Sequence, residues 1–304
     1  MHLHTLAPAK VNLVLRVGPA RADGYHDLLT LMVPLDLGDE VDVRVGARAG
    51  PVTCRVPGRP ELDGDGNLAA RAAQLFRERF GIDRSIAIRI RKQTPVTAGL
   101  GGGSSDAAAV LRCLARAFRV RDRAALARLA LEVGSDVPFF LGPGPAWATG
   151  RGEKLRPAVV PPLDLVLVYP RDPALAIRAG EAYGWLDAAR QGRTVKQPRR
   201  PARFRPTLLG NDLQEACLTH RPELSPLLGR LVGAGATAAI MSGSGPTVFG
   251  VFPGRKPARE AAKAIASRRK DGLQVFLVRT VRRQPRATPW RSPRSASSRS
   301  ARRS

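Results

Sequence analysis

The sequence predicts an α+β protein that is long enough for two domains. Stretches of alternating apolar residues, typical of strands, are interspersed with stretches in which apolar residues recur at helical spacing. The chain has 304 residues, which is enough for two cores of ordinary size. Apolar residues make up 43% of it, as in a globular protein, and no apolar stretch is long enough to cross a bilayer.

In the first half, alternating apolar residues predict three strands: residues 3–17, 28–45 and 85–92. Asp23-Gly24 supplies a turn between the first two. Apolar residues at helical spacing predict three helices: residues 67–80, 104–118 and 122–133. The first helix ends before Gly81, a residue typical of helix C-termini. Residues 142–152 are rich in Gly and Pro and indicate a transition between domains.

In the second half, apolar runs predict strands at residues 163–169, at two places within 236–252, and at 273–281. Helices are predicted at residues 223–232 and 257–270. Residues 188–206 are basic and Pro-rich, which predicts a solvated loop. From Arg282 onward the chain is mostly Arg, Ser and Pro, a composition typical of disorder. The predicted domains are therefore 1–150 and 151–281, followed by a disordered tail at 282–304.

The composition also limits the classes of function. The net charge of +25, with eight Arg in residues 282–304, favours polyanionic partners: nucleic acid, an anionic membrane or phosphorylated metabolites. Charge alone does not choose among these. Cys54, Cys113 and Cys217 form no CxxC pair, so neither a zinc site nor a disulfide framework is expected. The N-terminus lacks the pattern of a signal peptide, and a cytoplasmic location is expected.

The most informative segment is PVTAGLGGGSSDAAA, residues 95–109. Its four glycines let the backbone approach a ligand closely, and Ser104 and Ser105 add hydroxyl groups at the start of a helix. The first turn of a helix also offers free N–H groups and a positive dipole end. No GK[ST] follows, as a Walker A loop requires, and Ser104 replaces the last glycine of GxGxxG. The segment predicts an anion cradle, although the glycines alone fit a flexible Ser-capped loop equally well.

Two other segments accompany the glycine-rich one. In APAKVNL, residues 7–13, Lys10 and Asn12 lie on one face of a strand because side chains alternate. MSGSGPT, residues 241–247, is a second glycine-rich turn between apolar runs. In this order and at these separations, the three segments resemble the GHMP kinase superfamily over about residues 3–281. The resemblance implies the GHMP kinase fold, with two α/β two-layer domains at about 1–150 and 151–281. The second domain would be ferredoxin-like, and the active site would lie in the cleft between the two.

Four further segments resemble one family within that superfamily, whose members use ATP to phosphorylate a methylerythritol linked to cytidine diphosphate. The segments are RADGYHD at 21–27, GNL at 66–68, GSDVPF at 134–139 and NDL at 211–213. The resemblance implies phosphorylation of the 2-hydroxyl of CDP-methylerythritol in the non-mevalonate route to isoprenoid precursors. It also implies that Mg²⁺ arrives with ATP, without a dedicated protein cage.

Two other functions are weighed against this one. A GHMP kinase for homoserine or mevalonate is disfavoured, since those substrates carry no base for the DGYH segment to contact. Nucleic-acid binding through the Arg-rich tail is salt-dependent and non-specific, and is at most an accessory property. No specific nucleic acid and no membrane is therefore expected as a partner. The sequence does not choose between a monomer and a homodimer.

The resemblance assigns catalysis to Asp136 and Lys10. Asp136 would accept the proton of the substrate hydroxyl, and Lys10 would stabilise negative charge beside it. Each has a structural alternative. Asp136 could cap a helix that begins at Val137-Pro138, and a lysine near a strand end is usually solvated. Lys10 stands in an otherwise apolar stretch, which weakens the second alternative.

The resemblance places the ATP phosphates against the glycine-rich segment and the adenine near Asn67 and Leu68. Asn67 could equally cap the helix that follows it. The phosphate-binding residues would be Pro95, Val96, Thr97, Ala98, Gly99, Leu100, Gly101, Gly102, Gly103, Ser104 and Ser105. Ser104 or Ser105 could also touch the magnesium ion.

On the substrate side, the resemblance implies that Asn12 orients the sugar alcohol, Tyr25 stacks on cytosine and His26 binds the edge of the base. Tyr183 would stack on the other face, but Arg178-Ala179-Gly180 lacks the hydroxyl residue common there, which leaves this contact open. The second glycine-rich turn would close the substrate side through Ser242, Gly243, Ser244 and Gly245. Tyr25 could also be an exposed hairpin tip, and the 242–245 turn could be purely structural. Gln214 stands where the family commonly has Glu and is given no role.

Overall fold

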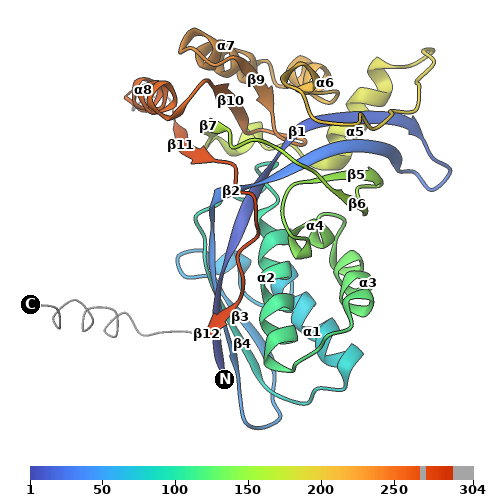
Figure 1. The fold of residues 1–304 in the computed structure, drawn as a ribbon, viewed down its shortest axis with the longest axis vertical. Coiled ribbons are helices and arrows are strands. Elements are labelled where there is room, and N and C mark those ends of the chain that lie inside the picture. The colour runs from blue at the N-terminus through green and yellow to red at the C-terminus, as the bar shows by residue number, and fades with distance from the viewer. Residues whose placement is uncertain (268–271, 290–304) are drawn as a thin grey trace, which may run out of the picture.

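Two β-sheets organise the chain in the computed structural model, which describes residues 1–267 and 272–289 (Figure 1). The larger sheet has the order β12-β1-β2-β4-β3, with β5 on β2, β6 on β5 and β8 on β1. Its strands are β1 His2–Ala20, β2 His26–Val45, β3 Val52–Arg55, β4 Ile86–Arg91, β5 Ala146–Gly150, β6 Lys154–Pro157, β8 Gly210–Asn211 and β12 Thr288–Pro289. The smaller sheet has the order β11-β7-β10-β9. Its strands are β7 Asp164–Pro170, β9 Ala238–Met241, β10 Val248–Phe252 and β11 Leu273–Arg279.

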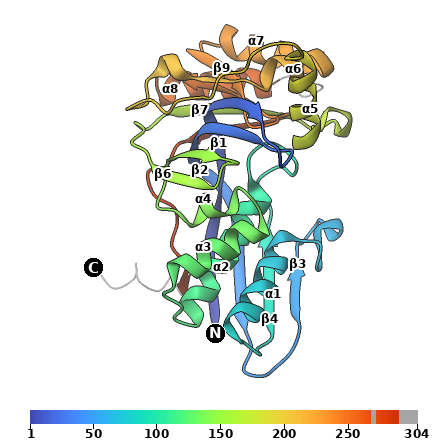
Figure 2. The same ribbon diagram turned by 90° about the vertical axis from the view of Figure 1, so that its right-hand side faces the viewer.

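Strands β1 and β2 form a long antiparallel ribbon that runs from the lower body of the molecule to the upper one (Figures 1 and 2). Their register shifts between Pro8 and Lys10, between Asn12 and Val14, and between Val17 and Ala20. Such bulges bend a strand and re-aim its side chains. The ribbon therefore changes direction within the segment that carries Lys10 and Asn12.

Helices cover one face of the larger sheet. They are α1 Leu68–Phe80, α2 Gly102–Ala117, α3 Arg123–Val133 and α4 Val137–Leu141. Strand β4 shows why only one face is covered: Ile86, Ile88 and Ile90 are buried, whereas the residues between them are exposed. The buried isoleucines join Phe76 of α1 and Leu111 of α2 in one core. This core fixes where α2 begins, and therefore where the glycine-rich segment lies.

The upper body carries the remaining helices: α5 Ala179–Ala189, α6 Gln214–His220, α7 Ser225–Gly233 and α8 Arg255–Ala266. The described residues also contain 3-10 helices at Pro60–Leu62, Pro173–Leu175, Pro206–Leu208 and Pro222–Leu224. A further core joins the two sheets, because Val11 and Leu31 of the ribbon pack with Leu167 and Phe249 of the smaller sheet. The mixed α and β content and the two sheets confirm the predicted fold class. The division at residue 150 stays a prediction.

Several elements were not predicted from the sequence, among them the short strands β3, β6 and β8. Residues 142–152 include strand β5, which pairs with β2 from Leu28–Gly150 to Met32–Ala146. Helices α5 and α6 were not predicted, because Gly180 and Gly184 weaken the helical pattern of the first and the second is short. Residues 268–270, which the last predicted helix included, lie outside the described residues. Across the described ranges no helix is long and apolar enough to span a bilayer, and the cytoplasmic location stays a prediction.

The segment after Arg282 returns to the larger sheet. Strand β12 pairs with β1 through Thr288 and His4, and the side chain of Ala287 is buried in the first core. The prediction of disorder from Arg282 onward is therefore wrong for residues 282–289. Backbone pairing with a free strand edge requires no apolar pattern, so the composition did not reveal it. The rest of the predicted tail, residues 290–304, lies outside the described residues.

Candidate active site

A cleft of about 660 Å³ lies where β1, β2, the glycine-rich segment, α4, α5 and the 241–245 turn meet. Eleven of the residues predicted for function line it. They are Lys10, Asn12, Tyr25, His26, Gly99, Gly101, Ser104, Asp136, Tyr183, Gly243 and Ser244. The volume is typical of small-molecule pockets. Residues from positions 10 to 244 thus meet in one place.

Lys10 is held in the cleft from both its backbone and its side chain. Its backbone N–H donates to the Leu100 carbonyl at 2.9 Å, which ties β1 to the glycine-rich segment. The ammonium donates to Asn12 Oδ1 at 2.7 Å and lies 3.6 Å from Asp136 Oδ2. The residue is only 5% exposed, so the alternative of a solvated surface lysine is wrong.

Asn12 is oriented by a residue that sequence reasoning missed. Its Nδ2 donates to Thr30 Oγ1 at 2.7 Å, and that hydroxyl donates to the Val14 carbonyl at 2.8 Å. The amide oxygen of Asn12 therefore faces the ammonium of Lys10. Thr30 lies in the strand paired with β1, so a polar residue within an apolar strand was the available signal.

Asp136 immediately precedes α4, as predicted, but its side chain makes no capping hydrogen bond. Its backbone angles, φ −86° and ψ −13°, are already helical. The carboxylate faces Lys10 instead, and about a third of the side chain is exposed to the cleft. The structural alternative of a helix cap is therefore wrong, and the carboxylate is left available to a ligand.

The glycine-rich segment is shaped by two left-handed residues, Gly99 (φ 72°) and Gly101 (φ 69°). A Cβ on Gly99 would lie 2.1 Å from the Ser242 carbonyl oxygen, and one on Gly101 would lie 3.1 Å from the side-chain carbons of Lys10. Only glycine fits at either position. Gly101 is the N-cap of α2, so the first N–H groups of that helix open beside Lys10.

The two serines of this segment differ in access. Ser104 lines the cleft, whereas Ser105 is fully buried and its hydroxyl has no hydrogen-bond partner in the described part of the chain. An orphaned buried hydroxyl beside a helix N-terminus fits a site made for an anionic ligand. Ser104 is the better placed of the two to reach such a ligand or its metal ion.

The second glycine-rich turn, residues 241–247, is hydrogen-bonded to the first glycine-rich segment. Ser242 is fully buried and its hydroxyl donates to the Gly99 carbonyl at 3.0 Å. Asn211 Nδ2 donates to the carbonyls of Met241 and Gly243 at 2.8 and 2.7 Å. Gln214, which was assigned no role from its motif, accepts a hydrogen bond from the Met241 N–H at 2.9 Å. The NDL segment and Gln214 therefore position the turn.

Aromatic residues form the far end of the cleft. His26 Nε2 donates to Asp187 Oδ1 at 2.9 Å, and the His26 ring stacks on Tyr183 with centroids 5.3 Å apart. Burial raises the pKa of Tyr183, and the charge of Asp136 adds to the effect, so the phenol stays protonated. Tyr25 is half exposed, and the guanidinium of Arg151 lies 4.7 Å from its ring centroid. Sequence reasoning missed Asp187 and Arg151.

A second lysine, also missed, lies on the other side of the glycine-rich segment. Lys92 donates to Asp39 at 2.6 Å and to Asp106 at 2.8 Å, and both carboxylates are buried. Asp39 also accepts from the N–H groups of Gln93 and Thr94 at 2.6 and 2.8 Å. This buried cluster joins β2, the end of β4 and the first turn of α2. It therefore holds the segment in place from behind.

The other predicted residues lie outside the cleft lining. They are Asn67, Leu68, Pro95, Val96, Thr97, Ala98, Leu100, Gly102, Gly103, Ser105, Ser242 and Gly245. Asn67 caps α1, with its Oδ1 accepting from the Ala69 N–H at 2.9 Å, so the predicted alternative is confirmed. Its contact with adenine stays a prediction. Within residues 1–267 and 272–289, no cluster of His, Cys, Asp or Glu could hold a metal ion.

Comparison with known proteins places this site in a family. Residues 67–144 match the GHMP kinases N terminal domain and residues 198–271 match GHMP kinases C terminal. A 4-diphosphocytidyl-2-C-methyl-D-erythritol kinase from Anaeromyxobacter dehalogenans (strain 2CP-C) is 76% identical over 100% of this chain and 99% of its own. The chain belongs to the 4-diphosphocytidyl-2-C-methyl-D-erythritol kinase family. The family predicted from the motifs is thereby confirmed.

More distant members of this family cover nearly the same region. The enzyme of that name from Deinococcus radiodurans is 40% identical over 87% of this chain and 89% of its own. A crystal structure of 4-(cytidine 5'-diphospho)-2C-methyl-D-erythritol kinase aligns with a TM-score of 0.75 at 35% identity, over 91% of this chain and 98% of that one. The similarity therefore spans both sheets and the cleft between them.

Proposed function

We propose that this chain transfers the γ-phosphoryl group of ATP to the 2-hydroxyl of 4-diphosphocytidyl-2-C-methyl-D-erythritol, with Asp136 as the base and Lys10 as the charge stabiliser. The observation that carries the proposal is the 3.6 Å approach of these two side chains in a cleft shared with the glycine-rich segment. Phosphoryl transfer depends on positioning and on stabilising charge, and this cleft offers both. The family to which the chain belongs supports the reaction.

In this mechanism Asp136 accepts the proton of the attacking hydroxyl. Its carboxylate has no capping hydrogen bond to give up, and it is open to the cleft. The Lys10 ammonium favours the ionised carboxylate and stabilises the negative charge that develops beside it. Asn12 fixes the position of that ammonium through a 2.7 Å hydrogen bond and can also orient the substrate.

ATP is proposed to bind along residues 95–105, with its adenine near Asn67 and Leu68. The left-handed Gly99 and Gly101, the free first turn of α2 and the orphaned Ser105 hydroxyl all fit a phosphate group. Mg²⁺ is proposed to arrive with ATP and to neutralise phosphate charge when bound, with Ser104 as its protein contact. Gly102 and Gly103 contribute backbone N–H groups.

The aromatic end of the cleft is proposed to bind the cytosine. Tyr25 and Tyr183 both line it, and an aromatic face can stack on a base. The hydrogen bond to Asp187 fixes which nitrogen of His26 is protonated, so that the ring can contact the base edge in one orientation. Gly243 and Ser244 are proposed to close the side of the cleft nearest Lys10.

A competition assay tests this function. The chain is supplied with ATP, Mg²⁺ and equal concentrations of the CDP-linked substrate, homoserine and mevalonate, and the phosphorylated products are measured. We expect kcat/KM for the CDP-linked substrate to exceed the other two by more than about 10³-fold, since only it fills the aromatic end. Adding EDTA should stop the reaction. Phosphorylation of homoserine or mevalonate in preference would refute the proposal.

A further inference from the structure

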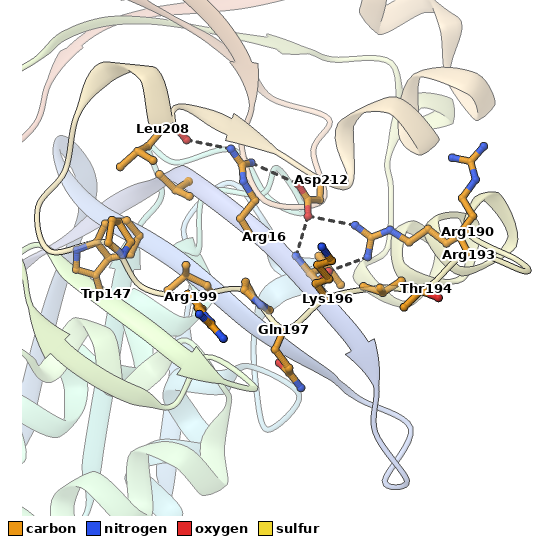
Figure 3. Close-up of a pocket in the computed structure, with 16 residues that line it drawn as sticks. Arg16, Trp147, Arg190, Arg193, Thr194, Lys196, Gln197, Arg199, Leu208 and Asp212 are labelled. Carbon is orange, nitrogen blue, oxygen red and sulfur yellow. Dashed lines mark hydrogen bonds and ion pairs between the residues drawn. The ribbon is translucent and has the colours of Figure 1, made fainter.

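A second cavity, of about 500 Å³, lies beside the β1–β2 ribbon (Figure 3). Leu28 and Thr30 line the active cleft, whereas Leu29 lines this second cavity. Successive side chains of a strand point to opposite faces, so the ribbon separates the two. The roof of the second cavity is the basic, Pro-rich segment that follows α5, residues 190–201.

The polar wall of this cavity carries an excess of positive charge. Its cationic residues are Arg16, Arg190, Arg193, Lys196 and Arg199, and Asp212 is its single carboxylate. Asp212 is already engaged, because it pairs with Arg16 at 3.3 Å and Arg190 at 3.1 Å and accepts from the Val17 N–H at 3.0 Å. Figure 3 shows these contacts converging on Asp212.

The remaining cations are available to a ligand. Arg193, Lys196 and Arg199 are exposed, and no carboxylate of residues 1–267 or 272–289 pairs with any of them. Lys196 and Arg199 belong to one short stretch of the roof and are three residues apart. Two unpaired cations at the rim of a cavity favour an anion as its ligand, and a phosphate is the anion that Arg and Lys recognise best.

The floor of the same cavity is apolar. Val14, Val17, Leu29, Trp147 and Leu208 line it from three strands and a neighbouring 3-10 helix. Val14, Val17, Leu29 and Trp147 are each only 3% exposed, so the floor offers a small apolar surface, which free inorganic phosphate would not contact. A molecule that combines a phosphate with a hydrocarbon body would cover the floor and meet the cations at the rim. The volume suits a small metabolite rather than a polymer.

We propose that this second cavity binds a small metabolite with an apolar body and a terminal phosphate or diphosphate, held by Lys196 and Arg199. The site shares no lining residue with the active cleft. The proposal concerns a ligand distinct from both ATP and the CDP-linked substrate, and it stands independently of the reaction assigned to the active cleft.

Isothermal titration calorimetry with n-pentyl diphosphate tests the proposal on the full chain. The active cleft is first saturated with a non-hydrolysable ATP analogue and CDP, so that the probe cannot enter it. We expect one molecule of probe to bind, and the double variant Lys196→Gln/Arg199→Gln to raise Kd at least about tenfold. Inorganic pyrophosphate should bind at least about tenfold more weakly than the alkyl compound, because it leaves the apolar floor bare.

The matched control is Arg200→Gln/Arg203→Gln, which removes the same charge from the same segment but does not alter the cavity lining. We expect its Kd to stay within about twofold of the parent. Unchanged kcat in both variants verifies that they fold. Absence of binding with the cleft saturated, equal losses in the two variants, or equal affinity for pyrophosphate would each overturn the proposal.

Discussion

Two lysines flank the glycine-rich segment, and their ion pairs differ in number, distance and burial. A Cβ on Gly101 would lie 3.1 Å from the side chain of Lys10, and one on Gly102 would lie 3.3 Å from the ammonium of Lys92. Lys10 meets one carboxylate at 3.6 Å, and that carboxylate is partly exposed. Lys92 meets two carboxylates at 2.6 and 2.8 Å, and both are buried.

The two groups differ in the way that their proposed tasks require: Lys10 and Asp136 act on the substrate, and Lys92 with its aspartates holds the loop. A charge that acts on a substrate has to be incompletely paired, and the carboxylate beside Lys10, that of Asp136, is about a third exposed. A charge that supports a loop is most effective when its partners surround it, as they surround Lys92. Residue type alone does not distinguish the two, since both are lysines with aspartates beside the same loop.

The largest effect is expected from Asp136→Asn. The amide cannot accept the proton of the attacking hydroxyl, so kcat should fall by about 10³-fold to 10⁴-fold, or about 4–5 kcal/mol of barrier. The free energy of unfolding should stay within about 1 kcal/mol, because the side chain makes no capping hydrogen bond. Steady-state kinetics and urea denaturation measure the two quantities. A variant with near-normal kcat would remove Asp136 from the mechanism.

The pair to which catalysis is proposed, Lys10 and Asp136, could be recognised from the sequence. Lys10 and Asp136 stand in short motifs whose residues act locally: an alternating strand, a glycine-rich turn and a helix start. The long strands and helices α1 to α3 were also predictable, because their apolar periods extend over many residues. The spacing of apolar residues does not reveal what a residue does, so the proposed roles of Lys10 and Asp136 came from the family resemblance.

The buried cluster of Lys92, Asp39 and Asp106 could not be recognised from the sequence. Lys92 ends the segment SIAIRIRK, in which each basic residue looks like one of a solvated row. Its partners Asp39 and Asp106 stand 53 and 14 residues away, and nothing local marks their burial. Strands β5 and β12 were missed for a similar reason, because pairing with a distant strand, rather than their own composition, makes them strands.

A smaller effect, on stability, is expected from Lys92→Met. The substitution leaves Asp39 and Asp106 buried without their cation, which should lower the free energy of unfolding by about 3 kcal/mol. This is the low end of the usual range, since one of the two carboxylates can take up a proton. Urea denaturation measures the loss. The folded fraction should keep kcat within about tenfold, and a loss as large as that of Asp136→Asn would erase the division between the two lysines.

The smallest effect is expected from Asp106→Asn, and it depends on pH. Burial raises the pKa of Asp106 to about 8 against the opposing charge of Lys92. The folded chain therefore holds a proton that the unfolded chain releases near pH 4, and stability from this group is lost as pH rises toward 8. Asn mimics the protonated carboxyl, so at pH 5 the two proteins should differ by less than about 1 kcal/mol.

Between pH 5 and pH 8 the parent should lose stability relative to Asp106→Asn, because only the parent has a buried carboxyl to ionise. Urea denaturation of both proteins at intervals of pH gives the difference directly and cancels the groups that they share. A difference that moves in this direction means that, near neutral pH, Lys92 faces one charged carboxylate, as Lys10 does. The exposure of the partner carboxylate, rather than charge balance, then separates the two sites. If the difference in free energy of unfolding stays constant from pH 5 to pH 8, Asp106 is negatively charged over that whole range. Lys92 would then face two charges and Lys10 one, and this charge balance would distinguish the two sites.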